Sequence, residues 1–481
     1  MRSAWRTLLM MVAVGVLLPL ATTAHAQGPY PTGPDDPFVA VPDDLDLDLR
    51  MKAAYDGDDI VWLFEWEAAG NWYHDMVVYG NGAWTRQGGS QVGEKPFGIY
   101  EDRITFLVDP GTVRGFANQG CYVSCHAGSR FLSDQIPPAT IQAVPELANR
   151  SDLRKYIAES RVGDAWWEAP WDAFQSPETL TQLREVGVFL DFWHWRAHRG
   201  NPVGYSDDQY VLEYRLNDGS RGAYATNWDA ENGRPAFMFD ESKVGFAALD
   251  WDRMVARGYD QQNDIYYLTE DTAVPFDPDR EWRDGDVIPR IVLREPQGSQ
   301  AAITADGTWA DGTWRVELRR AMDTGYATTD HALLEGRTYN IGFAVHANAT
   351  GSRWHYISHP LQVGIGVPAD FTVVRFEGDA PDWSTMPWTH VPLFYPGQVT
   401  WEWLVSDAHA GAPDVRADTR SCVDCHGESQ QAVLKLAQAS TSRELRGPAT
   451  TVNRWMTLAT LMVLLGGGTT VALTLTSRRE A

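Results

Sequence analysis

The four cysteines of this 481-residue chain limit its folding more than any other feature, because two short motifs use all of them. One motif holds Cys422 and Cys425, two residues apart and followed directly by His426, which is typical of a c-type haem attachment site. The other holds Cys121, Cys125 and His126, and it is the same pattern lengthened by one residue. The sequence therefore predicts two haem c groups, with thioether bonds to the cysteines and with His126 and His426 as iron ligands.

The first motif leaves alternatives open, because its extra residue forces the backbone to bulge if both sulfurs are to reach the haem. A noncovalent haem is one alternative. A disulfide between Cys121 and Cys125 is another, since an exported chain meets an oxidising compartment. Zinc is a third, although closed zinc sites usually have four protein ligands.

Further iron ligands are predicted from the remaining histidines and methionines. His409 shortly precedes the second motif, in a pattern that resembles multihaem cytochromes, and it is either the distal ligand there or a solvated loop histidine. For the first haem, His194 is flanked by Trp193 and Trp195, which could wall a haem pocket or simply surround a core histidine. The candidates for this ligand are His194, His355 and Met238.

Both ends of the chain carry targeting patterns. Two arginines, an apolar run over residues 8–20 and small residues before Gln27 predict a signal peptide over residues 1–26. Residues 455–475 carry no charge and predict a transmembrane helix, with residues 476–481 as a cytoplasmic tail. The glycines and threonines of this segment leave a weak or interfacial helix as the alternative. We expect an exported body on the periplasmic side of the inner membrane, held by one C-terminal anchor.

The composition gives 64 acidic and 40 basic residues, a formal net charge of -24. This charge argues against nucleic acid or an anionic membrane surface as a partner. It favours a basic soluble partner, or it is the generally acidic surface of a soluble body.

Short segments rich in β-branched and aromatic residues predict a mainly β fold. Residues 47–66 form two such segments around an Asp/Gly turn and predict a hairpin. Other predicted strands lie at residues 103–108, 210–214, 287–293, 314–318, 339–345 and 371–374. Their spacing indicates an antiparallel sandwich or barrel, and we predict a sandwich-like haem-binding domain with helical insertions, chiefly in residues 141–189.

The predicted domains follow from these patterns. A Pro- and Asp-rich leader covers residues 27–45, and the β-rich haem-binding domain covers 46–375. A small haem c segment follows at 376–440, and a linker at 441–454 joins it to the predicted anchor.

Five short stretches in order resemble the haem-binding domain of the ethylbenzene dehydrogenase gamma subunit, which is also found in related cytochromes and in DMSO-reductase-type enzymes. They are YEDR at residues 100–103, GCYVSCH at 120–126, DFWHWR at 191–196, GYSDD at 204–208 and WHYIS at 354–358. The resemblance covers roughly residues 45–371. It implies a mostly β domain that holds one haem and exchanges electrons with a molybdenum-containing catalytic subunit.

In gamma subunits of this kind the haem is noncovalent and has methionine and lysine as axial ligands. This chain departs from that pattern in its Cys121 to His126 motif, its second motif and its predicted anchor.

The predicted function is that of a membrane-anchored, exported dihaem c-type cytochrome. It would relay electrons between a membrane-associated redox system and a partner, either a molybdenum oxidoreductase or a soluble cytochrome. No phosphate-binding loop or nucleophile motif points to a stand-alone catalyst. Two alternatives remain: a haem enzyme with one open coordination site that acts on a small oxidant or reductant, and a β-sandwich ligand-binding module with disulfides.

Overall fold

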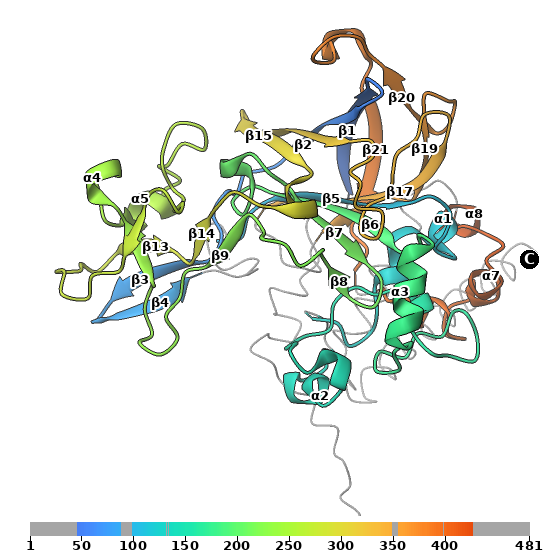
Figure 1. The fold of residues 1–481 in the computed structure, drawn as a ribbon, viewed down its shortest axis with the longest axis horizontal. Helices are drawn as coiled ribbons and strands as arrows, with labels where there is room; N and C mark the ends of the chain where they lie inside the picture. The colour runs from blue at the N-terminus through green and yellow to red at the C-terminus, as the bar shows by residue number, and fades with distance from the viewer. Residues whose placement is uncertain are drawn as a thin grey trace, which may run out of the picture.

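The computed structural model describes residues 46–87, 99–130, 132, 134–348, 355–397 and 399–426 (Figure 1). The predicted signal peptide, leader, linker and cytoplasmic tail all lie outside these residues. None of the helices within them is long and apolar enough to cross a membrane, and residues 455–475 lie outside them. The transmembrane helix in the predicted fold is therefore unsupported.

Six strands close into a barrel, and this closure is the centre of the fold. In order around the ring they are β1 (Asp46–Tyr55), β20 (Phe371–Arg375), β19 (Leu361–Ile365), β17 (Thr338–His346), β18 (Tyr356–Ile357) and β21 (Thr389–Phe394). The ring closes because β21 pairs with β1 over Asp46 to Met51. The pairs β1–β20 and β19–β20 are parallel.

The predicted antiparallel sandwich is therefore wrong. Strand spacing in the sequence does not distinguish a sandwich from a barrel, since closure depends on the pairing of β1 with two strands more than three hundred residues away. One of these, β21, lies in the range assigned to the C-terminal haem c segment.

Two extensions of the same sheet leave the barrel. Next to β1 come β2 (Asp59–Glu67), β16 (Thr313–Ala321) and β15 (Thr304–Ala310). Next to β17 come β5 (Arg103–Asp109), β6 (Leu190–Arg196), β7 (Asp207–Val211) and β8 (Arg215–Leu216). The predicted hairpin over residues 47–66 is confirmed as β1 and β2, which pair from Tyr55 and Ile60 outward. Its turn is fixed by Asp56, whose carboxylate accepts the N–H groups of Asp58 and Asp59.

A lobe of small sheets lies to one side of the barrel, at the left of Figure 1. Its larger sheet comprises β11 (Leu249–Asp250), β13 (Asp286–Pro289), β3 (Met76–Gly80) and β4 (Ala83–Gln87). The strand pairs β10 (Phe237–Phe239) with β12 (Ala273–Pro275) and β9 (Tyr224–Thr226) with β14 (Ile291–Leu293) are separate. The short helices α4 (Glu241–Val244) and α5 (Trp251–Val255) belong to the same stretch of chain.

The expected helical region at residues 141–189 is only partly helical. It contains the end of α2 (Pro138–Gln142), α3 (Pro177–Glu185) and two short 3₁₀ turns. The helix α3 begins at Ser176, whose hydroxyl accepts the N–H of Thr179, and it has no buried residue. This stretch covers the cysteine motif and contributes buried residues to the hydrophobic cluster around it, among them Leu147, Leu153, Tyr156 and Ile157.

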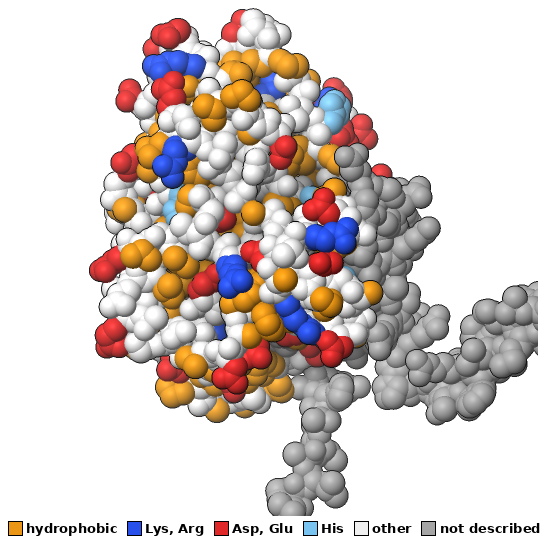
Figure 2. All heavy atoms as spheres, turned by 90° about the vertical axis from the view of Figure 1, so that its right-hand side faces the viewer, with side chains coloured by type: hydrophobic (Ala, Val, Ile, Leu, Met, Phe, Trp, Pro, Cys, Tyr) orange, Lys and Arg blue, Asp and Glu red, His pale blue; other side chains and the backbone are white. Residues whose placement is uncertain are grey.

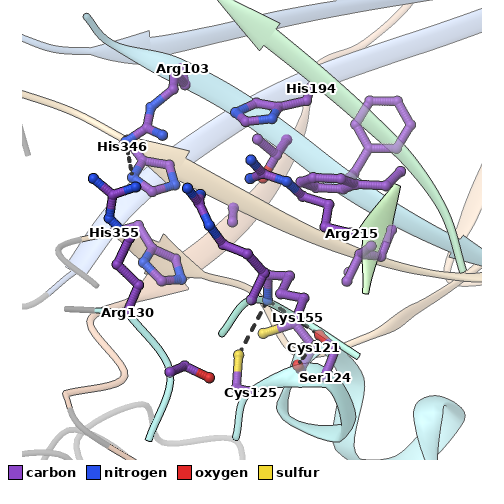
Figure 3. Close-up of a pocket in the computed structure, with 18 of the residues that line it drawn as sticks. Arg103, Cys121, Ser124, Cys125, Arg130, Lys155, His194, Arg215, His346 and His355 are labelled. Atoms are coloured by element: carbon purple, nitrogen blue, oxygen red, sulfur yellow. Dashed lines mark hydrogen bonds between the residues drawn. The ribbon is translucent and has the colours of Figure 1, made fainter. Parts of the chain in front are cut away.

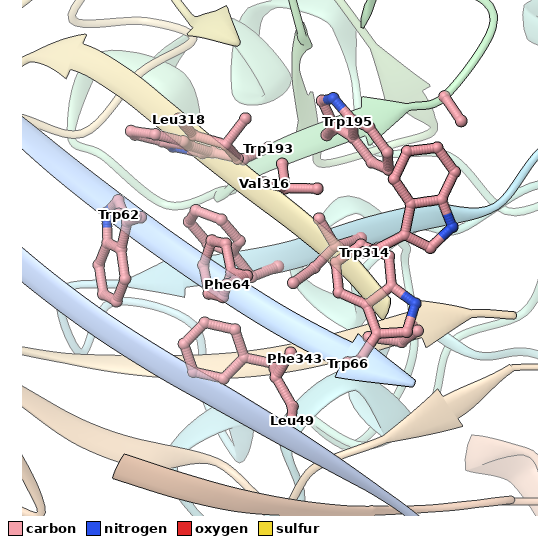
Figure 4. Close-up of a cluster of buried hydrophobic side chains, with 14 of the residues drawn as sticks. Leu49, Trp62, Phe64, Trp66, Trp193, Trp195, Trp314, Val316, Leu318 and Phe343 are labelled. Carbon is pink, nitrogen blue, oxygen red and sulfur yellow. The ribbon is translucent and has the colours of Figure 1, made fainter. Parts of the chain in front are cut away.

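The part of the core between β2, β6 and β16 contains a cluster of tryptophans. Figure 4 shows Trp66 of β2, Trp195 of β6 and Trp314 of β16 in one cluster, with centroid separations of 5.2 to 6.3 Å. Trp62 and Phe64 continue it along β2. Such rings bury a large apolar area each, so these tryptophans serve packing.

Candidate functional site

The first cysteine motif lies on a short helical turn next to the barrel. After β5, the chain forms α1 (Phe116–Gln119) and then a 3₁₀ helix, η1 (Gly120–Ser124). Gly120 joins them with φ 56° and ψ -138°, and a Cβ at this position would come within 3.1 Å of Pro360. Only glycine suits such a backbone and such a close approach. This turn places Cys121 and Cys125 on one side, against strands β5 and β17.

Both cysteines line one cavity, which is drawn in Figure 3. The space between its atoms, including open solvent at the mouth, is about 860 Å³. One part of its wall is apolar and comprises Phe106, Leu107, Leu153, Phe192 and Ala344. The other part is cationic and comprises Arg103, Arg130, Arg154 and Arg215. A cavity with an apolar and a cationic side suits a flat apolar ring that carries carboxylates at one edge.

Lys155 lies beside the cysteines and was not found by sequence reasoning. Its ammonium group is 3.2 Å from Cys125 Sγ and 3.2 Å from Ser124 Oγ. A neighbouring cation favours the thiolate, which is the reactive form of cysteine. None of the four cysteines, all of which are described, forms a disulfide in the structure.

Three imidazoles also line this cavity: His194, His346 and His355. The rings of His346 and His355 stack with centroids 4.7 Å apart, and Arg103 contacts His346 Nδ1 at 2.8 Å. Both ring nitrogens of His194 lie close to the guanidinium of Arg196, at 3.2 and 3.0 Å. Burial, aided by Arg196 and Arg215, lowers the pKa of His194 well below its ordinary value, so this ring is neutral.

Of the two alternatives for the tryptophans beside His194, a haem wall or core packing, the structure shows core packing. His194 and Phe192 face the cavity, whereas Trp193 and Trp195 lie in the hydrophobic core with both rings fully buried. The reason is the two-residue period of a strand, which turns neighbouring side chains of β6 to opposite faces.

His126 is not among the residues that line the cavity. Its ring is fully buried and stacks on Tyr156 at 3.6 Å. Nδ1 lies 2.7 Å from the Glu402 carboxylate, and Nε2 lies 2.9 Å from the carbonyl oxygen of Tyr156. The structure thus holds His126 against the C-terminal segment, on the side away from the cavity.

Met238 is not brought to the cavity either. It lies half-buried on β10, in the lobe of small sheets, and pairs with Val274 of β12. The sequence-predicted residues that meet at the first site are Cys121, Cys125, His194 and His355.

The second motif forms the short helix α8 (Cys422–His426), in which residues three apart share one face. Cys422 is buried and Cys425 half-buried. His409 is buried earlier in the same segment, where its ring lies 4.9 Å from that of Trp403 and its Nδ1 lies 2.8 Å from the Leu404 carbonyl. Between them lies α7 (Ala412–Ala417).

The two motifs meet although they lie about three hundred residues apart in the sequence. Gln119, two residues before Cys121, accepts a hydrogen bond from Cys422 Sγ at 2.9 Å and donates to the Arg420 carbonyl at 2.9 Å. The N–H of Trp401 donates to the Cys125 carbonyl at 2.7 Å. Cys121 and Cys422 also belong to one hydrophobic cluster. In Figure 1, α1 and α8 accordingly lie side by side.

A second cavity shares a wall with the first and is lined almost entirely by polar residues. Arg103, Arg130, Arg154, Arg215 and His194 face both. Its remaining lining includes Arg86, Arg196, Arg199 and Arg290, together with Tyr100, Tyr224, His74 and Asp75. We call it the arginine cavity.

The charges in the arginine cavity shift the pKa values of its members. Burial opposes ionisation of Tyr100, but Arg103 and Arg199 outweigh it and lower the pKa of the phenol to about 7. Burial, with Arg154 and Arg196 nearby, lowers the pKa of Arg215 to about 9. Both shifts have the sign expected of a region with excess positive charge.

The donor set of the first cavity fits a haem. Two thiols lie on one side, three imidazoles also line the cavity, and arginines suited to propionate groups line the edge. The described residues contain no group of three or more His, Cys, Asp or Glu placed to hold a metal ion.

Sequence reasoning missed the arginines and Lys155 because each looks like an ordinary surface cation. The DFWHWR and YEDR stretches do contain Arg103 and Arg196, but the sequence offers no local signal for their convergence with residues 130, 154 and 215.

Two comparisons with known proteins give matches. A family model described as ethylbenzene dehydrogenase matches residues 26–358. The chain is 31% identical over 196 residues to cytochrome c-552 of Stutzerimonas stutzeri. That match spans 39% of this chain and 61% of the relative, so it includes less than two thirds of that cytochrome. Both findings point to a haem-containing electron-transfer protein.

Proposed function

Because the chain belongs to the ethylbenzene dehydrogenase family, we propose that it is an exported c-type cytochrome that holds two haems and relays electrons. The observation that carries the proposal is the first cavity, where two cysteine thiols, histidine rings and an arginine wall meet. The signal peptide predicted at residues 1–26 supports export, since covalent haem attachment is completed outside the cytoplasm.

In the first cavity, Cys121 and Cys125 would bind haem through thioethers, which the nearby Lys155 assists by favouring the thiolate. A haem bound there supplies reversible one-electron transfer at its iron. His355 is our preferred ligand among the cavity histidines, because Arg196 engages both ring nitrogens of His194. His126 remains the ligand predicted by the motif, and its coordination requires release from Glu402 and Tyr156.

The second haem would be held by Cys422 and Cys425, with His426 and His409 as ligands. The contact of Gln119 with Cys422 supports direct electron transfer between the two groups, because it keeps the two motifs adjacent. The arginines of the first cavity would hold the propionates of the first haem, and its apolar residues would pack against the ring.

The partner we propose is a redox protein, either a molybdenum-containing catalytic subunit or a soluble cytochrome. Membership of the ethylbenzene dehydrogenase family supports the first. The likeness to cytochrome c-552 supports a cytochrome role for this chain.

The decisive experiment counts covalent haem. The pyridine haemochrome of the purified chain should give two haems per polypeptide. Replacing Cys121 and Cys125 together with serine should leave one, and replacing Cys422 and Cys425 together should also leave one, so that each double variant controls for the other. A wild-type protein without covalent haem would contradict the proposal.

Absorption spectra then test the ligands. His355→Ala should convert one haem from low spin to high spin, whereas His194→Ala should not. An unchanged spectrum of His355→Ala would rule out this ligand. Binding of carbon monoxide by the wild-type ferrous protein would show an open iron site and contradict a pure relay.

A further inference from the structure

The arginine cavity has a larger positive charge than a haem needs. Eight of the thirteen described residues that line it are arginines, and Asp75 is the one carboxylate among them. Its inner part is desolvated, since Arg103 and Arg196 are almost fully buried, whereas Arg86 is about half exposed. The cavity is separate from the thiols, because neither cysteine of the first motif lines it.

Within the described part of the chain, four carboxylates form ion pairs with the arginines of the cavity. Asp75 pairs with Arg86 and Arg290, and Asp152 pairs with Arg130 and Arg154. Two further pairs are Arg196 with Asp207 and Arg199 with Glu101. Eight arginines less these four carboxylates leave an excess of four positive charges among the described residues, and the ionised fraction of Tyr100 lowers it by about half a charge near pH 7. The two propionates of a haem would remove two more and still leave an excess of positive charge.

Arg215 shows most directly where that excess lies. It faces both cavities from β8, and the described part of the chain gives it neither an ion pair nor a side-chain hydrogen bond. Its charged neighbours include Arg154 and Arg196, which repel it. In Figure 3 its guanidinium points toward the same space as those of Arg103 and Arg130, which come from other segments.

Converging guanidinium groups are donors matched to oxyanions. Each presents a planar fork of N–H groups that binds two oxygens of one anion, and desolvated charge of one sign binds the opposite charge strongly. The outer surface does not compete for such an anion, since the chain carries a net charge of -24. On the face in Figure 2, acidic side chains are dispersed among basic and apolar ones.

We propose that the arginine cavity binds one small inorganic oxyanion next to the edge of the first haem, with Arg215 as a direct ligand. The inference rests on the proposed function in one respect, namely that the charge count includes the two propionates of a bound haem. Propionates and free oxyanions share the chemistry that arginine recognises, so the experiment must separate them.

Isothermal titration calorimetry of the full haem-loaded chain makes that separation. Sodium sulfate, phosphate, nitrate and nitrite are titrated in turn, each against sodium chloride at equal ionic strength. At least one should bind saturably, with one anion per chain, and should raise the melting temperature as a ligand of the folded state does. The haemochrome of the same sample reports the haem independently, so a missing haem and a missing anion site give different results.

The test variant is Arg215→Gln. Because Arg215 has no carboxylate partner among the described residues, its loss leaves no buried anion unpaired, and the variant should fold with unchanged or higher stability. Its oxyanion affinity should fall about tenfold or more, the usual effect of losing a hydrogen bond to a charged group. Arg215→Lys should retain part of the affinity. Arg337→Gln removes the same charge from an exposed position and should leave the affinity unchanged.

Three results would overturn the inference. One is that no oxyanion binds better than chloride, and another is that Arg215→Gln binds as well as the wild type. The third is that Arg215→Gln lowers the haem reduction potential while no oxyanion binds to either protein, which would show that propionates alone occupy the cavity.

Discussion

Arg320 joins three strands in the core, and its replacement by methionine should destabilise the protein strongly. Its fully buried guanidinium lies 2.9 Å from Asp191 of β6 and 3.5 Å from Asp208 of β7, and it donates to the His331 carbonyl. Since β6 carries His194 and Arg196, the network supports one wall of both cavities.

Methionine fills a similar volume but leaves two buried carboxylates facing each other. Breaking a buried ion pair from one side costs about 3–5 kcal/mol. We therefore expect Arg320→Met to lower the free energy of unfolding by about that amount, with a melting temperature lower by roughly 5–10 °C. Arg319→Met is the matched control on the same strand. Arg319 is 36% exposed, its ion pairs are 3.6 and 4.0 Å long, and its loss should cost less than about 1 kcal/mol.

The pH dependence of the stability of Arg320→Met distinguishes the loss of a charge partner from the loss of packing. Burial raises the pKa of Asp191 to about 6 even beside Arg320, and burial also raises that of Asp208 well above its ordinary value. A carboxyl whose pKa is raised on folding stabilises the fold while it is protonated, and that stability is lost as the pH rises through its folded pKa. Without Arg320 both pKa values should rise further, so the variant should lose additional stability between about pH 6 and pH 8.

Urea unfolding followed by far-UV circular dichroism across that pH range measures both effects. Adding Asp191→Asn and Asp208→Asn to Arg320→Met should recover most of the lost stability and flatten the pH profile, because no buried charge remains. A loss below about 1 kcal/mol for Arg320→Met, or pH profiles parallel to the wild type, would refute the reasoning.

Three further predictions concern the candidate site. Around pH 7, oxyanion binding should be accompanied by proton uptake, because an added anion favours the neutral phenol of Tyr100, whose pKa is about 7. Calorimetry in two buffers of different ionisation enthalpy measures this uptake, and Tyr100→Phe should abolish it. Glu402→Gln should lower stability by about 1 kcal/mol near neutral pH, measured by urea unfolding, since it weakens the contacts with His126 and the Ala127 N–H. His126 and these hydrogen bonds outweigh burial and hold the pKa of Glu402 below its ordinary value, so the difference from the wild type should vanish as the pH falls below about 4. A saturating oxyanion should lower the reduction potential of one haem in an optically monitored redox titration, and Arg215→Gln should show no such shift.

Sequence patterns predicted well those features that depend on neighbouring residues. The hairpin of β1 and β2 follows from two β-rich segments and the Asp56 turn, and both cysteine motifs are visible as local strings. The DFWHWR stretch carries the family resemblance but was not predicted as a strand. Its tryptophans, which the sequence left as either a haem wall or core packing, lie in the core.

Features formed by distant segments could not be predicted. Barrel closure depends on β21 meeting β1, and the contact between the motifs depends on Gln119 meeting Cys422 across 303 residues. Met238 was a candidate only because methionine can bind haem iron, and nothing local showed that β10 lies in another lobe. The arginine cavity was the hardest feature to predict, because its arginines come from segments that share no sequence pattern.

The arrangement of charge has a consequence for electron transfer. Reduction adds an electron to the haem, so positive charge beside it stabilises the reduced state and an anion among those charges stabilises the oxidised one. Thermodynamic linkage then requires that the oxidised protein bind the oxyanion more tightly than the reduced protein does. The difference in binding free energy equals the difference between the reduction potentials with and without the anion, expressed as a free energy. Because Gln119 joins the first motif to Cys422, such a shift would change the driving force between the two haems, and the direction of the relay would depend on the anion.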